Sequence, residues 1–108
     1  MNQKGEGKMK CQKLVRDKIP EIIKSQGREP IIRILDQQEY KTELEKKLDE
    51  EVSEYHSSKE IEELADILEV VYALCEADGY AKEELEQVCQ RKHEVRGGFA
   101  GKIFLEEN

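Results

Sequence analysis

Four carboxylates stand out as residues that could do chemistry, because they form two pairs at helical spacing. Glu51 and Glu54 are three residues apart, and so are Glu63 and Asp66. Residues at this spacing are neighbours on one helix face. On a helical projection Glu51 and Glu63 fall within apolar arcs, where an unpaired ionised carboxylate is costly or has a raised pKa. Four carboxylates converging between two antiparallel helices suit a hard cation, Mg²⁺ or its substitute Mn²⁺.

The alternative is that this acidic pattern is only a solvated surface. The chain has 25 acidic residues among 108, so two such pairs can arise by chance. Other metals fit less well. A dinuclear iron bundle uses Glu-x-x-His pairs, but Ser53 and Gln90 stand three residues before the two histidines. Histidines and cysteines are also not grouped at the spacing of a zinc site.

A second set of residues, Lys92, Arg96 and Phe99, could bind a nucleotide. Lys92 and Arg96 are four residues apart on one helical face, and they lead into R-G-G-F. The two cations could hold phosphates, the glycines allow close approach of the backbone, and Phe99 could pack against a base or ribose. The alternative is that both cations are surface residues whose stems cover apolar side chains.

The composition limits the class of protein. A net charge of −7 disfavours a nucleic-acid polymer as partner, because the chain has no basic stripe for the phosphate backbone. We expect no membrane span, because the longest apolar run is too short, and no secretory signal, because the first ten residues contain no apolar segment. Three cysteines without C-x-x-C spacing favour a reducing, cytoplasmic location. Because only 37% of the residues are hydrophobic, we expect a homodimer or homotetramer to complete the core.

The elements that would position these residues are helices. We expect residues 1–12 to be a disordered tail and residues 13–108 to be a single domain. Apolar residues at helical spacing predict a short helix that starts near Asp17 and ends at Gly27. Three long helices should follow and pack antiparallel as an all-α bundle, over residues 36–57, 57–78 and 82–95. Asp36 is a good N-cap for the first of these, and Ser57 with Glu60 resembles a capping box for the second. Short strand-like segments are expected near 31–35 and 102–105.

Two acidic motifs carry a resemblance to a known family. E-E-V-S-E at residues 50–54 and E-L-A-D at residues 63–66 resemble the signature of the all-α nucleoside triphosphate pyrophosphohydrolases, the MazG-like superfamily. K-L-V-R-D-K-I-P-E-I-I at residues 13–23 and R-G-G-F-A-G-K-I-F-L at residues 96–105 are similar to the motifs of its small house-cleaning branch. The resemblance therefore extends over nearly all of the chain after the N-terminal tail.

The resemblance implies a MazG-like helical bundle that hydrolyses a nucleoside triphosphate between the α and β phosphates. The matching positions imply catalytic, Mg²⁺-binding roles for Glu51, Glu54, Glu63 and Asp66, support of these ligands by Glu50, and substrate binding by Lys92, Arg96, Phe99, Lys13 and Arg16. Either Glu54 or Glu51 could accept a proton from the attacking water. The alternatives are a phosphoribosyl-ATP pyrophosphohydrolase of histidine biosynthesis and a non-catalytic helical dimerisation module.

Overall fold

The computed structural model describes residues 12–108, which contain four helices and no strand. The helices are α1 (Ile19–Ser25), α2 (Gln37–Ser58), α3 (Ile61–Ala77) and α4 (Lys82–Arg96). The all-α class is therefore confirmed for this part of the chain. The predicted disordered tail lies outside the described residues, apart from residue 12. No helix among residues 12–108 is both long enough and apolar enough to cross a membrane.

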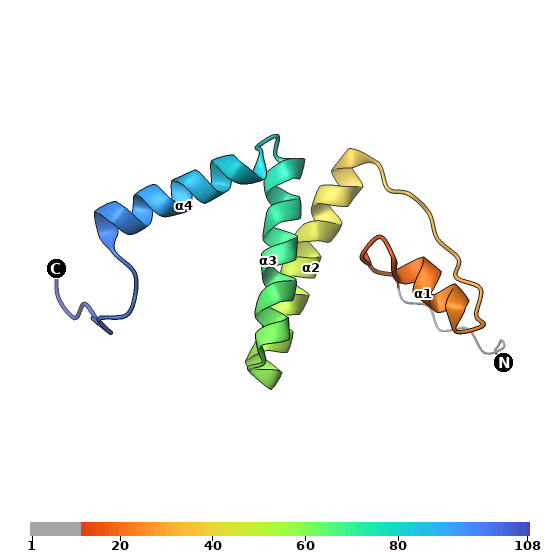
Figure 1. Ribbon diagram of the computed structural model, residues 1–108, viewed down its shortest axis with the longest axis horizontal. Helices are drawn as coiled ribbons and strands as arrows, with labels where there is room; N and C mark the ends of the chain where they lie inside the picture. The colour runs from red at the N-terminus through yellow and green to blue at the C-terminus, as the bar shows by residue number, and fades with distance from the viewer. Residues whose placement is uncertain (1–11) are drawn as a thin grey trace.

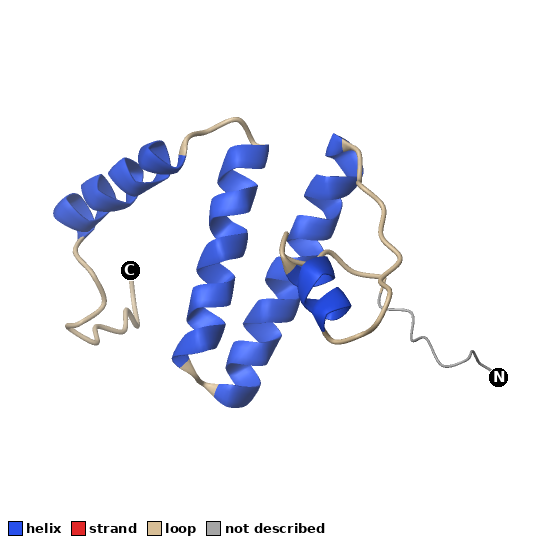
Figure 2. Cartoon of the chain, turned by 45° about the vertical axis from the view of Figure 1, so that its right-hand side comes forward, coloured by secondary structure: helices blue, strands red, loops and turns tan. Residues whose placement is uncertain are grey.

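The centre of the fold is an antiparallel hairpin of α2 and α3, which lie side by side in both views (Figures 1 and 2). The predicted N-cap of α2 is confirmed: the Glu39 backbone N–H donates to Asp36 Oδ1 at 2.8 Å. The turn between the helices uses Lys59 in a left-handed conformation (φ 60°). Leu44 of α2 and Val70 of α3 are the buried hydrophobic residues of the described chain. The hairpin thus contains the core of this single chain.

The predicted capping box at the start of α3 is not formed. Helix α2 continues through Ser58, and the N-cap of α3 is Glu60, whose side chain makes no capping hydrogen bond. Ser58 Oγ accepts from the Glu60 backbone N–H at 3.2 Å instead. The prediction failed because α2 continues past Ser57 and ends at the left-handed Lys59, so that the N-cap of α3 lies three residues after Ser57, at Glu60.

Helix α1 is short and lies on the α2 side of the hairpin, opposite to α4 (Figure 1). Pro20 stands in its first turn, as expected from its fixed φ angle. Its N-cap residue is Lys18, without a side-chain hydrogen bond, and not the predicted Asp17.

Helix α4 does not complete the predicted three-helix bundle within one chain. It leaves the end of the hairpin that lies opposite the α2–α3 turn, and it extends away from both helices (Figure 1). Many large apolar side chains consequently remain exposed. On α3, α4 and the C-terminal segment these are Ile61, Leu64, Leu68, Val88, Val95, Phe99, Ile103, Phe104 and Leu105.

The two strand predictions are wrong. Residues 31–35 and 102–105 form neither strand nor helix. Their β-branched and aromatic residues favour extended backbone, but a strand also needs a neighbouring strand to receive its hydrogen bonds. The described chain offers none, and Ile34 and Ile103 are 89% and 91% exposed.

Candidate metal centre

The α2–α3 hairpin brings three of the four predicted carboxylates together. Glu51 of α2 and Glu63 and Asp66 of α3 each offer one oxygen atom, and these atoms lie within 4.8 Å of one another. Glu63 and Asp66 are neighbours because they are three residues apart near the start of α3. Glu51 faces them because α2 runs antiparallel beside α3 (Figure 1). We call these three residues the acidic cluster.

Glu51 is the most constrained member of the acidic cluster. The residue is only 6% exposed, and its Oε1 atom is buried without a hydrogen-bond partner. Its Oε2 atom lies 3.5 Å from Lys47 Nζ, at the long end of an ion pair. Burial raises the pKa of the Glu51 carboxyl above its ordinary value; Lys47 opposes this, and the charges of Asp66 and Glu54 reinforce it. A buried carboxylate oxygen therefore faces further negative charge and lacks a donor.

Each of the other two members has a hydrogen-bond partner outside the cluster. Ser58 Oγ donates to Glu63 Oε2 at 2.9 Å. Arg16 Nη2 donates to Asp66 Oδ1 at 2.7 Å and forms an ion pair with it. Glu63 is thus held by a residue at the end of α2, and Asp66 by a residue of the N-terminal segment. The orientation of the cluster thus depends on residues from three parts of the chain.

The donor set fits a small divalent cation. Mg²⁺ binds oxygen ligands at about 2.0–2.1 Å in octahedral geometry, so that oxygens on opposite sides of the ion lie about 4 Å apart. The oxygens of the acidic cluster lie within 4.8 Å of one another, which is only slightly more than this separation. A cation bound there through Glu51 Oε1 would give this buried oxygen a partner. Small side-chain rotations would close the remaining distance.

Two other acidic residues of the predicted site lie outside this group. Glu54 is exposed and is not among the three residues whose oxygens converge. Glu50 accepts from Lys13 Nζ and from Lys47 Nζ, each at 3.5 Å. Because Lys47 also pairs with Glu51, Glu50 is linked to the acidic cluster through that lysine.

The predicted nucleotide-binding residues near the C-terminus are not beside the acidic cluster within this chain. Lys92 and Arg96 belong to the second half of α4, and both are exposed. That half of α4 lies away from the hairpin (Figure 1). Phe99 is 98% exposed. By contrast, Arg16 of the N-terminal motif contacts the acidic cluster through Asp66, and Lys13 of the same motif pairs with Glu50 beside it.

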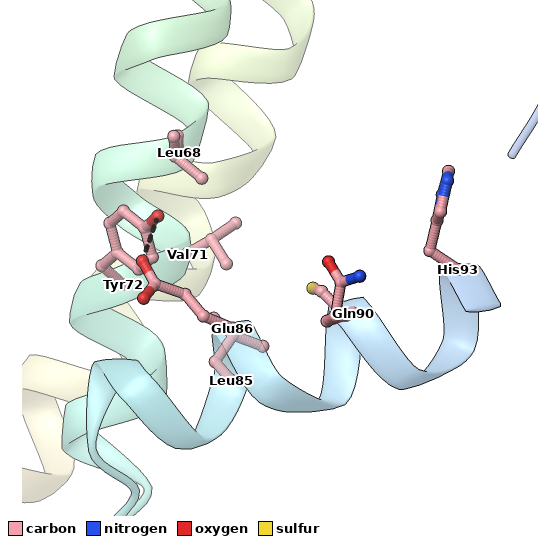
Figure 3. Close-up of a pocket in the computed structure, with 8 residues that line it drawn as sticks. Leu68, Val71, Tyr72, Leu85, Glu86, Gln90 and His93 are labelled. Carbon is pink, nitrogen blue, oxygen red and sulfur yellow. Dashed lines mark hydrogen bonds between the residues drawn. The ribbon is translucent and has the colours of Figure 1, made fainter.

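A separate open groove lies between α3 and α4 (Figure 3). It is mostly apolar, and none of the acidic cluster's residues lines it. Tyr72 of α3 donates its Oη–H to Glu86 of α4 at 3.3 Å across the groove. His93 stands at the far end of the row of side chains in Figure 3. The lining residues are Leu68, Val71, Tyr72, Leu85, Glu86, Cys89, Gln90 and His93.

Sequence reasoning missed two residues that contact the acidic cluster, Lys47 and Ser58. Lys47 could have been found, because it stands four residues before Glu51 on the same helix face. Ser58 had no such signal. It reaches Glu63 only because α2 ends immediately after it and the chain reverses there.

Comparison with known proteins gives a local likeness. No family model matches the chain, and no solved structure matches it. A protein of Mycolicibacterium smegmatis, described as uncharacterized, is 53% identical over 45 residues. These residues are 42% of this chain and 46% of the relative, so the chain matches less than half of the relative's length. The likeness assigns no activity.

Proposed function

We propose that this chain hydrolyses a nucleoside triphosphate between its α and β phosphates, with Mg²⁺ as cofactor and with nucleoside monophosphate and pyrophosphate as products. The substrate class and the bond follow from the resemblance of the two acidic motifs to those of MazG-like pyrophosphohydrolases. A house-cleaning role on noncanonical nucleotides follows from the N-terminal and C-terminal motifs in the same way.

The observation that carries the proposal is the buried, unpartnered Oε1 atom of Glu51 within a group of three converging carboxylates. Leaving a buried polar atom without a partner costs about 1–3 kcal/mol. A carboxylate that is only part of a solvated surface would not be buried without a hydrogen-bond partner. A divalent cation held by Glu51, Glu63 and Asp66 removes the cost.

The chemistry divides between the cation and the side chains. When bound, Mg²⁺ neutralises phosphate charge and lowers the pKa of a coordinated water. Glu51, Glu63 and Asp66 hold the cation. Glu54 is one helical turn after Glu51 and outside the converging group, so we assign it as the acceptor of the water's proton. Lys13 and Arg16 supply positive charge to the phosphates from the N-terminal side.

We further propose that a second copy of the chain supplies Lys92, Arg96 and Phe99. Exposed apolar side chains on α3 and α4 need a cover. The second half of α4 contains Arg91, Lys92 and Arg96, whose charges complement an acidic cluster. A symmetric dimer in which α4 packs on the partner's hairpin would bury the apolar surface and bring these cations to the carboxylates.

The test is pyrophosphate release from a panel of common and modified nucleoside triphosphates, with Mg²⁺ and with EDTA. We expect Mg²⁺-dependent release of pyrophosphate and not of single phosphate. Glu63→Gln and Asp66→Asn should each lower turnover by about 100-fold or more, because loss of a residue that only supports a metal ligand already costs about 10–100-fold. Glu69→Gln, on the exposed face of α3, is the matched control and should keep full activity.

Two rivals are separated by the same panel. A phosphoribosyl-ATP pyrophosphohydrolase would release pyrophosphate from phosphoribosyl-ATP much faster than from any nucleoside triphosphate. A non-catalytic dimerisation module is favoured by the exposed apolar residues of the C-terminal segment, such as Phe104, which is 86% exposed. That module would release pyrophosphate from none of the compounds, and Mg²⁺ would not stabilise it.

A further inference from the structure

The segment that precedes α1 is held to the α2–α3 hairpin by two ion pairs. We call residues 12–18 the N-terminal strap. Arg16 pairs with Asp66 at 2.7 Å, and Lys13 pairs with Glu50 at 3.5 Å. Both pairs are partly exposed: the Arg16 and Asp66 side chains have 55% and 37% of their surface accessible. Ion pairs of this kind are weak, worth about 0.2–1 kcal/mol each, so the strap can be released.

The two ion pairs differ in what they contact. Asp66 belongs to the acidic cluster, whereas Glu50 does not. Arg16 therefore places a positive charge on a group of carboxylates that also contains the unpartnered oxygen of Glu51. In the absence of a metal ion, the guanidinium offsets part of the repulsion among these carboxylates.

We propose that Arg16 is an exchangeable counter-charge of the acidic cluster: it binds Asp66 while the cluster holds no metal, leaves when a divalent cation binds, and then binds a phosphate oxygen of the substrate. This inference rests on the proposed function, since it takes the acidic cluster as the metal centre. It adds a coupling between the cation, the strap and the substrate, carried by one residue.

The exchange follows from charge. A divalent cation between the three carboxylates satisfies Asp66 and repels a guanidinium that lies 2.7 Å from one of its oxygens. A phosphate chain bound to the cation brings new anionic oxygens to the same place. Arginine binds phosphate through two parallel hydrogen bonds, which a single contact with Asp66 Oδ1 does not match. The guanidinium therefore moves from the carboxylate to the phosphate.

The effect of removing Arg16 on metal affinity distinguishes an exchangeable counter-charge from a residue that only orients Asp66. If Arg16 only orients Asp66 as a ligand, its removal weakens metal binding. If Arg16 competes with the metal, its removal strengthens metal binding. Lys13→Ala is the matched control, because it removes the same charge from the same strap but from an ion pair outside the acidic cluster.

The first experiment titrates the full-length chain with Mn²⁺ alone and follows free Mn²⁺ by its electron paramagnetic resonance signal. We expect Arg16→Ala to bind Mn²⁺ about two- to fivefold more tightly than the wild type, as loss of an exposed ion pair predicts. Lys13→Ala should leave the Mn²⁺ affinity close to that of the wild type. Equal or weaker Mn²⁺ binding by Arg16→Ala overturns the exchange, and so does equal tightening by Lys13→Ala.

The second experiment measures binding of inorganic triphosphate by calorimetry at saturating Mg²⁺. Arg16→Ala should weaken triphosphate binding by about tenfold, within the range for a charge-assisted hydrogen bond to phosphate, and Arg16→Lys should recover part of the loss. Unchanged triphosphate affinity in Arg16→Ala overturns the transfer to phosphate. A wild-type chain that binds no Mn²⁺ at all overturns the proposed metal centre itself, so the two failures are distinguishable.

Discussion

Replacing Glu51 by Gln should stabilise the metal-free protein. The wild-type carboxylate is 6% exposed, has one oxygen without a partner, and faces Asp66 and Glu63. The unsatisfied atom costs about 1–3 kcal/mol, while the 3.5 Å ion pair with Lys47 returns about 0.2–1 kcal/mol. Gln has the same shape, no charge, and N–H groups that can donate to the neighbouring carboxylates. We expect the free energy of unfolding at pH 7 in EDTA to rise by about 1 kcal/mol, or the Tm by about 4–8 °C.

Mg²⁺ should reverse the order of stability, so that wild type becomes more stable than Glu51→Gln. A ligand at 100 times its Kd stabilises the folded state by about 2.7 kcal/mol. Wild-type protein should gain this amount from Mg²⁺, whereas Glu51→Gln, which lacks a charged ligand, should gain far less. The assay is urea unfolding at one fixed protein concentration, with EDTA and with Mg²⁺, for wild type, Glu51→Gln and the surface control Glu69→Gln. A Glu51→Gln variant that is less stable than wild type in EDTA at pH 7 would refute the reasoning about the unpartnered carboxylate.

Three further outcomes are expected. Burial raises the folded-state pKa of Glu51, so the contribution of this carboxyl to stability is fully present below the ordinary Glu value of about 4.3 and is lost as pH rises through the raised value. The difference in the free energy of unfolding between Glu51→Gln and wild type in EDTA should therefore close near pH 4 and widen toward pH 7. Urea unfolding at both pH values measures this difference. Asp36→Ala removes the N-cap hydrogen bond to Glu39 and should lower the free energy of unfolding by about 1 kcal/mol, while Asp36→Ser should keep most of it. If two copies share each site, mixing inactive Glu63→Gln with inactive Lys92→Ala should restore about a quarter of wild-type turnover in a randomly mixed symmetric dimer, and an inactive mixture would contradict the sharing.

The local chemistry of the sequence predicted the helices well. Asp36 marks the start of α2, and glycine marks the end of α4, where Gly97 has a φ angle of 81°. Caps and helical periodicity depend on residues within one turn, so they can be read from the sequence alone. The i, i+3 pair of Glu63 and Asp66 was predictable for the same reason, and so was the burial of Glu51.

The remaining features depend on contacts between distant parts of the chain. Arg16 and Asp66 are 50 residues apart, and no spacing rule connects them. The strand predictions at 31–35 and 102–105 failed because propensity does not supply a partner strand. The direction of α4 was also not predictable, since helix periodicity does not decide whether an apolar stripe packs on its own chain or on another. Glu54 was grouped with the other carboxylates on spacing and on the family resemblance, neither of which shows that only the oxygens of Glu51, Glu63 and Asp66 converge.

The central claim is that one divalent cation binds between Glu51, Glu63 and Asp66. Crystals grown with Mn²⁺ and measured at the manganese absorption edge test it most directly. We predict an anomalous difference peak within coordination distance of all three carboxylates, with Glu51 Oε1 among the ligand atoms. The absence of a peak there, with the three side chains turned outward into solvent, would contradict the account.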